Sequence, residues 1–177
     1  MNDQKILGEN RRNLLLEILK NNYEPITGRE LARRMNVSRQ VIVNDVSLLK
    51  AKSHSIVATS QGYLYLNNGK EEKAKRIIAC YHTPEQTEAE LNLMVDHGVT
   101  VEDVKIEHPI YGDLTASVMV SNRIEVQQFL KKMKQTNASY LLELTDGTHL
   151  HTVSATSDKL LDEVEKALEE ANFLVKK

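Results

Sequence analysis

The 177-residue sequence predicts an α+β protein of two domains, on three observations. The first 66 residues contain three segments with apolar residues at helical spacing, followed by two short alternating segments typical of a β-hairpin. A charged connector, Asn67–Lys73, comes next. Beyond it, strand-like and helix-like segments interleave, which favours an α+β sandwich. We therefore expect one domain at residues 1–68 and another at 73–177.

The first predicted helix spans Glu9–Asn21, because its leucines and isoleucine recur every three to four residues. The second helix begins after Thr27. The segment Thr27–Glu30 has the pattern of a capping box, in which Thr27 accepts from the Glu30 amide and the Glu30 carboxylate returns to the Thr27 amide. These two helices supply one side of a small apolar core.

The third predicted helix begins after Ser38, a residue type that caps helices well. One face is apolar, and the other is polar and is the predicted DNA-reading surface. Arginine can bond guanine edges and glutamine or asparagine can bond adenine edges, so such a helix suits the major groove. An ordinary solvated helix surface is the alternative. The predicted DNA-binding residues are Ser38, Arg39, Gln40, Asn44 and Ser47.

Two alternating segments, Ser55–Thr59 and Tyr63–Leu66, flank a short turn and complete a winged helix-turn-helix. The stretch Gly28–Ile42 resembles the helix-turn-helix that opens biotin-operon repressors, although no Gly-Arg-Gly adenylation loop of a biotin ligase follows. Charge agrees with a DNA-binding role. Residues 1–66 hold 10 Lys+Arg against 6 Asp+Glu, whereas the remainder holds 13 against 19.

The composition and the first residues argue against a membrane protein and a secreted protein. No stretch reaches the roughly 18 apolar residues of a membrane helix, and the first residues lack the apolar segment of a signal peptide, so we expect a cytoplasmic protein that does not bind membranes. The single cysteine, Cys80, has no partner for an internal disulfide. It lies in the apolar segment Ile77–Tyr81 and is interpreted as a buried structural thiol.

The second domain is predicted to alternate strands and helices over its whole length. The expected strands are Ala74–Tyr81, Val99–Glu107, Thr115–Val120, Tyr140–Leu144 and Leu150–Ser154, and the expected helices are Pro84–His97, Arg123–Gln135 and Lys159–Ala171.

Four residues of this domain form a candidate metal set. His149 and His151 are two apart on a predicted strand, so their side chains share a face. His82 precedes a predicted helix start at Thr83–Gln86. Glu90 follows about two turns into that helix, roughly 12 Å along its axis, so we expect His82 to bend back toward it. Three imidazoles and one carboxylate suit a borderline divalent cation such as nickel or zinc.

These residues also carry a family resemblance. A winged helix followed by His82 and Glu90, the segment His108–Leu114 and the segment Gly147–His151 together resemble the niacin-responsive repressors of NAD biosynthesis, whose ligand-sensing domain is called the 3H domain. The resemblance covers essentially the whole chain. It implies that the metal ligands are His82, Glu90, His149 and His151, that nicotinic acid is the co-repressor, and that the operators lie near NAD-synthesis or niacin-uptake genes.

The resemblance leads to a mechanism and leaves alternatives open. Nicotinic acid or a related pyridine would bind at the metal, with Tyr111 and His108 as candidate pocket walls, although Pro109 and Gly112 also suit a structural His108 at a turn. The ligand would favour a homodimer whose winged helices match operator half-sites about one DNA turn apart. One alternative is a regulator that senses another metabolite and whose histidines are structural. The other is a metal-dependent hydrolase fused to a DNA-binding domain, with Glu90 as its general base.

Overall fold

The computed structural model describes residues 8–66 and 73–176. The chain divides into two compact units, residues 1–70 and 71–177. The predicted end of the first domain at residue 68 falls in the segment 67–72, which lies outside the described residues, and the predicted start of the second at residue 73 follows that segment. Among the helices of the described part, none is long and apolar enough to cross a membrane.

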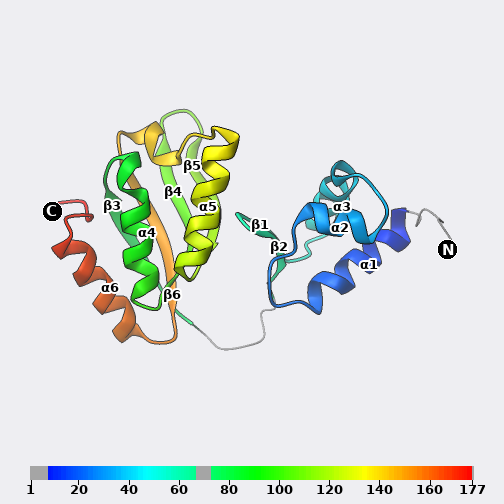
Figure 1. Cartoon of the computed structure of the whole chain (residues 1–177), viewed down its shortest axis with the longest axis horizontal. Helices are drawn as coiled ribbons and strands as arrows, with labels where there is room; N and C mark the ends of the chain where they lie inside the picture. The colour runs from blue at the N-terminus through cyan, green and yellow to red at the C-terminus, as the bar shows by residue number, and fades with distance from the viewer. Residues whose placement is uncertain (1–7, 67–72, 177) are drawn as a thin grey trace. The chain divides into compact units, whose positions relative to one another are not determined.

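The first unit is a winged helix-turn-helix, as predicted (Figure 1). Three helices are followed by a two-stranded antiparallel hairpin, in which Ile56 pairs with Tyr65 and Thr59 with Gly62. The apolar core between the helices includes Leu15, Leu31 and Ile42. The elements are α1 (Gly8–Lys20), α2 (Gly28–Arg34), α3 (Arg39–Ala51), β1 (Ile56–Thr59) and β2 (Gly62–Tyr65).

The predicted caps begin α2 and α3. The Oγ1 atom of Thr27 accepts the Glu30 amide at 3.1 Å, and the Oγ atom of Ser38 accepts the Val41 amide at 3.4 Å. The return bond from Glu30 to Thr27 was predicted wrongly. The Glu30 carboxylate instead bonds the guanidinium groups of Arg33 and Arg34, because charged donors on the next helical turn outcompete a neutral amide.

A buried ion pair joins α1 to α3. Arg11 Nε donates to Asp45 Oδ2 at 2.6 Å, and a second guanidinium nitrogen lies 3.2 Å from Asp45 Oδ1, which makes the contact bidentate. Asp45 is buried on the side of α3 that faces the core. The pair therefore fixes the helix that carries the predicted reading surface.

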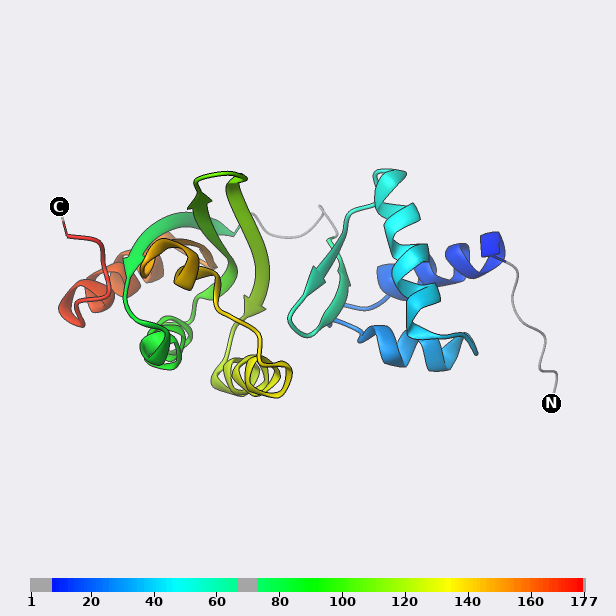
Figure 2. The ribbon, with the colours of Figure 1, turned by 90° about the horizontal axis from the view of Figure 1, so that it is seen from above.

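The second unit is a four-stranded antiparallel sheet with its three helices on one face (Figures 1 and 2). The strand order is β3-β6-β4-β5, and α4 packs between α5 and α6. The elements are β3 (Ala74–Tyr81), η1 (Pro84–Gln86), α4 (Thr87–Asp96), β4 (Thr100–His108), β5 (Gly112–Val120), α5 (Arg123–Thr136), η2 (Leu141–Thr145), β6 (Thr148–Ala155) and α6 (Asp158–Glu170).

Two predicted elements of this unit differ from the structure. The segment predicted as a strand at Tyr140–Leu144 is the 3-10 helix η2, closed by a bond from the Tyr140 amide to the Glu143 carboxylate and bounded by left-handed residues at Asn137 and Asp146. The helix predicted at Pro84–His97 is divided into η1 and α4. The first error arose because two adjacent leucines between turn residues suit a short strand as well as a tight helical turn.

The alternation of side chains along β3 and β6 decides which residues face the helices. On β3, Ile78 and Cys80 are buried while Ile77 and Tyr81 are exposed. On β6 the pattern is the reverse of ordinary amphipathic strands, because the histidines point inward and Leu150 points outward. The inner face therefore has a polar centre inside an apolar layer.

Candidate metal and effector site

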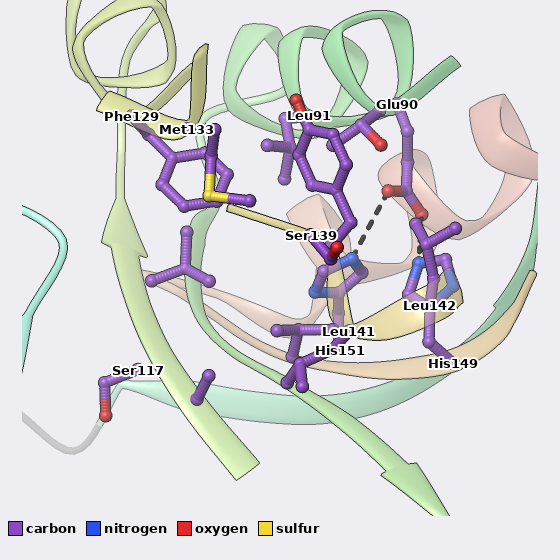
Figure 3. Close-up of a pocket in the computed structure, with 15 residues that line it drawn as sticks. Glu90, Leu91, Ser117, Phe129, Met133, Ser139, Leu141, Leu142, His149 and His151 are labelled. Atoms are coloured by element: carbon purple, nitrogen blue, oxygen red, sulfur yellow. Dashed lines mark hydrogen bonds and ion pairs between the residues drawn. The ribbon is translucent and has the colours of Figure 1, made fainter. Parts of the chain in front are cut away.

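Three imidazoles surround one carboxylate under the first turn of α4. Nε2 of His82 lies 2.7 Å from Glu90 Oε2, Nε2 of His151 lies 3.3 Å from the same oxygen, and Nε2 of His149 lies 3.3 Å from Glu90 Oε1. Figure 3 shows Glu90 pointing from α4 toward His149 and His151 on β6. The structure thus brings all four predicted metal ligands together, and each is almost completely buried.

The other ring nitrogen of every histidine faces a backbone carbonyl. His82 Nδ1 lies 2.8 Å from Thr83 O, His149 Nδ1 lies 2.9 Å from Gly147 O, and His151 Nδ1 lies 2.8 Å from Asp103 O. A carbonyl accepts only, so each Nδ1 carries the hydrogen and the Nε2 lone pair of the neutral ring points to the centre. Ligating histidines in proteins are commonly oriented in this way.

Glu90 reaches His82 because the helix begins later than predicted. The expected separation of roughly 12 Å assumed a straight helix starting beside His82. In the structure Thr83 caps the short turn η1, the regular helix begins at Thr87, and Glu90 lies in its first turn. The side chain of a helical residue also leans toward the N-terminus, which directs the carboxylate back to His82.

A bulge in β4 and a glycine before β6 hold the histidines in place. The register of β4 shifts between Val101 and Asp103, and there the Asp103 carbonyl faces His151. The Gly147 carbonyl accepts both the His149 ring and the His82 amide, the latter at 3.3 Å. At its φ of +97° a Cβ atom would lie 2.5 Å from His82 O, so only glycine fits.

The electrostatics of the cluster favour positive charge at its centre. Burial favours the neutral form of Glu90, but the three imidazoles outweigh it and hold the pKa of that carboxyl well below its usual value. Burial likewise opposes charge on His82 and His151, but the Glu90 carboxylate reverses this effect and raises the pKa of both rings. A carboxylate that attracts protons in this geometry attracts a divalent cation at the same place.

The residues fit a borderline divalent metal. His82 Nε2 is buried and lies 2.7 Å from a Glu90 oxygen, with no other hydrogen-bond partner in the described part of the chain. A bare nitrogen lone pair facing a carboxylate oxygen is unfavourable unless a cation or proton lies between them. Three imidazole nitrogens and one carboxylate match the ligand preference of nickel and zinc.

An apolar cavity of about 150 Å³ adjoins this cluster. An apolar cavity of about this volume holds one benzene ring in another protein. Glu90, His149 and His151 form its polar end, and Phe129 and Met133 line it on the side of α5 (Figure 3). The remaining walls come from α4, β4, β5 and the segment before and within η2, and include Leu91, Val104, Ala116, Val118, Tyr140, Leu141 and Leu142.

One polar side chain of the wall has no partner. Thr87 also lines the cavity, and its Oγ1 atom is buried without a hydrogen bond among the described residues. An unsatisfied buried hydroxyl costs about 1–3 kcal/mol. A ligand with a polar substituent could remove that cost.

His108 and Tyr111, the predicted pocket walls, do not line this cavity. Both lie at the β4–β5 hairpin, where Tyr111 is 74% exposed and its ring packs against that of His108 at 5.0 Å. His108 Nδ1 accepts the amides of Ile110 and Tyr111. The turn thus uses His108 as a local acceptor, in line with the structural alternative for this residue.

The predicted DNA-binding residues all lie on the exposed side of α3 or at its cap. Ser38, Arg39 and Gln40 begin the helix, where a major-groove helix contacts bases. Gln40 Nε2 bonds Asn44 Oδ1 at 3.1 Å, and Ser47 Oγ bonds the Val43 carbonyl at 2.9 Å. The first bond links the two amide side chains on the exposed surface of α3.

The sequence reasoning missed four contributors to the site: Cys80, Thr87, Asp103 and Gly147. Cys80 was missed because its place opposite His149 depends on the pairing of β3 with β6. Thr87, Asp103 and Gly147 act through a rotamer, a backbone carbonyl and a steric limit. No residue-type pattern encodes these roles.

Comparisons with known proteins agree with the two units. The sequence matches the 3H domain family over residues 75–177 and an HTH domain family over residues 11–64. It is 58% identical over 174 residues to the Transcription repressor NadR of Bacillus subtilis (strain 168), covering 97% of both chains. It is also 34% identical over 171 residues to the Probable transcription repressor NiaR of Thermotoga maritima, again covering 97% of both chains.

Proposed function

This chain belongs to the 3H-domain family and is a DNA-binding transcription repressor of the NadR and NiaR type, and from that premise we propose that nicotinic acid is its co-repressor, bound beside a divalent metal. The target genes would be those of NAD synthesis and niacin uptake. Since the relatives are named as repressors, the chain is a regulator and the hydrolase alternative falls away.

The ring-sized cavity that ends on the histidine cluster supports this proposal most directly. Its volume of about 150 Å³ suits a single six-membered ring, and its walls are mainly apolar. A pyridine carboxylate has an apolar ring, a ring nitrogen and one anionic substituent. The anion and the nitrogen lone pair both suit the end of the cavity where a cation would lie.

In this proposal His82, Glu90, His149 and His151 hold the metal. When bound, a nickel or zinc ion supplies a Lewis-acidic position for a ligand nitrogen or carboxylate oxygen. The chain's own residues do the rest. Phe129, Met133 and Leu142 exclude water from the ring, while the Thr87 hydroxyl donates a hydrogen bond to a polar substituent.

Ligand binding would be coupled to DNA binding through a homodimer. A ligand strengthens DNA binding only if it favours the arrangement of two copies that matches the operator, and the coupling is reciprocal. Two winged helices on half-sites about one DNA turn apart would meet that requirement. Rising nicotinic acid would then increase repression.

Calorimetric titration of nicotinic acid tests the proposal. The samples are nickel-loaded protein, chelator-stripped protein and a variant with His149→Ala and His151→Ala. Binding to the loaded parent alone supports the proposal. Equal binding in all three removes the metal from recognition, in line with a regulator whose histidines are structural, and no binding in any sample excludes niacin as the effector. Operator mobility shifts with and without nicotinic acid then test the sign of the coupling.

Thr87→Val tests the wall of the cavity in the same experiment. Valine keeps the shape of threonine and removes the hydroxyl. We expect nicotinic acid affinity to fall by about 2- to 10-fold, the equivalent of one neutral hydrogen bond, with metal content unchanged. Thr87→Ser, which keeps the hydroxyl, is the matched control. Unchanged or tighter binding in Thr87→Val would place the substituent elsewhere.

A further inference from the structure

The buried thiol of Cys80 lies beside the histidine cluster. In the β3–β6 pairing Cys80 is opposite His149, and both side chains point to the inner face of the sheet. The Cys80 Sγ, a Glu90 carboxylate oxygen and a His149 ring nitrogen all lie within 4.8 Å of one another. Cys80 is 0% exposed and forms no disulfide.

The spacing of these atoms is close to what one ion can span. Metal–sulfur and metal–nitrogen bonds are about 2.3 and 2.1 Å long, so a sulfur and a nitrogen bound to one ion would lie at most about 4.4 Å apart. Small side-chain rotations of Cys80 and His149 would therefore bring both within reach of one cation. His82 Nε2, which is buried and faces only the Glu90 oxygen at 2.7 Å, points to the same place from another segment of the chain.

Packing alone does not account for a cysteine at this position. Cys80 belongs to the apolar core of the second unit, where Ile78 precedes it on the same face of β3. On its other side, however, its sulfur faces a carboxylate and an imidazole. Valine or alanine would fill an apolar site equally well, whereas sulfur also offers a soft ligand atom.

We propose that Cys80 is a further ligand of the metal held by His82, Glu90, His149 and His151. This inference rests on the metal-binding part of the proposed function and not on niacin. On coordination the S–H bond breaks, its electron pair forms the sulfur–metal bond, and the proton passes to solvent. A thiolate among imidazoles selects nickel, zinc or cobalt over magnesium, calcium and manganese, so Cys80 sets which metals the repressor accepts.

Cobalt(II) substitution tests the proposal by spectroscopy. Thiolate ligands give cobalt(II) a near-ultraviolet sulfur-to-metal charge-transfer absorption that imidazole and carboxylate ligands lack. Since the chain has one cysteine, any such band must come from Cys80. Chelator-stripped parent, Cys80→Ser and Cys80→Val are titrated with cobalt(II), with bound cobalt measured directly and circular dichroism as the check on folding.

We expect the band in the parent at one cobalt per chain and its absence in both folded variants. The variants should also lose more than about 10-fold in cobalt affinity, because even an outer hydrogen-bond partner of a metal ligand contributes at least that much. Bound cobalt without the band in the parent overturns the inference and leaves the proposed metal site intact. Failure of the parent to bind cobalt, nickel or zinc overturns both. Niacin binding enters none of these readouts.

Discussion

The two units of this repressor place their polar functional residues in opposite ways. The winged helix keeps an apolar core and displays Arg39, Gln40 and Asn44 on the surface of α3. The 3H domain does the reverse. It buries three histidines and a glutamate in the centre of its fold and leaves apolar side chains such as Ile77 and Leu150 outside.

The difference suits DNA binding by the first unit and the proposed metal and ligand binding by the second. DNA is large and charged, so a convex polar helix can reach it without any change in the core. A small ligand and a metal must be surrounded, so their polar contacts have to be placed inside, where each unpaired group is costly. We therefore expect substitutions in the 3H domain site to change folding and binding together, and those on α3 to change binding alone.

Glu90→Gln tests the buried side of the comparison and has the largest expected effect. The amide lacks the charge that attracts a cation between three imidazoles, so nickel or zinc affinity should fall by more than about 100-fold, beyond what outer hydrogen-bond partners contribute. Metal titration with a competing chelator measures this loss. His97→Gln, at a histidine outside the cluster, should keep parental affinity. Parental affinity in Glu90→Gln would contradict the assigned centre.

Asp45→Ala tests the buried ion pairs that join α1 to α3. Removal of Asp45 takes the carboxylate away from the Arg11 and Arg12 guanidinium groups, and the loss of one partner of a buried ion pair typically costs about 3–5 kcal/mol. Denaturant unfolding of the full chain, followed by circular dichroism, should show an early transition for this unit alone. Glu17→Ala, at an exposed position of α1, is the control. Equal stability of the two variants would show that the pair does not hold α3.

Arg39→Ala tests the exposed side. One bidentate base contact contributes about 1–3 kcal/mol, so operator affinity should fall by about 5- to 150-fold, while the free energy of unfolding changes by less than about 0.5 kcal/mol. Fluorescence anisotropy at fixed salt measures the first quantity. Lys159→Ala removes the same charge from the 3H domain and should leave operator affinity nearly unchanged. A large loss of stability in Arg39→Ala would break the comparison.

Tyr111→Ala has the smallest expected effect. The side chain is largely exposed at the β4–β5 turn and does not line the cavity. Stability should change by less than about 0.5 kcal/mol and nicotinic acid affinity should stay within about 2-fold. Calorimetry on the nickel-loaded variant measures it. A clear loss of ligand binding would restore Tyr111 as a wall residue.

Most of the fold followed from periodicity and turn chemistry. Alternation and helical spacing identified β3 with its bounds, and placed the caps at Thr27 and Ser38. Tyr140–Leu144 was mistaken for a strand because short leucine-rich segments satisfy both periods. Tertiary contacts decide between a strand and a helical turn here, since η2 lies over the cavity and contacts β4 and β6.

The site was less predictable than the fold. The strand period placed His149 and His151 on one face, the predicted helix start added His82 and Glu90, and the family resemblance implied the same four residues. Cys80 escaped because its position beside His149 depends on the pairing of β3 with β6, two strands separated by most of the domain. The roles of Asp103 and Gly147 depend on a bulge and on a steric limit, which become visible only once the strands are in register.

Gly147 should tolerate no substitution, although it contributes no side chain to the site. It has no side chain and binds nothing, yet its carbonyl holds two of the histidines and its φ admits no Cβ atom. A saturation library scored for repression in cells should therefore reject every replacement at position 147 as firmly as replacements of the histidines. A residue-by-residue tolerance map would thus single out, among the positions essential for sensing, one that contributes only backbone.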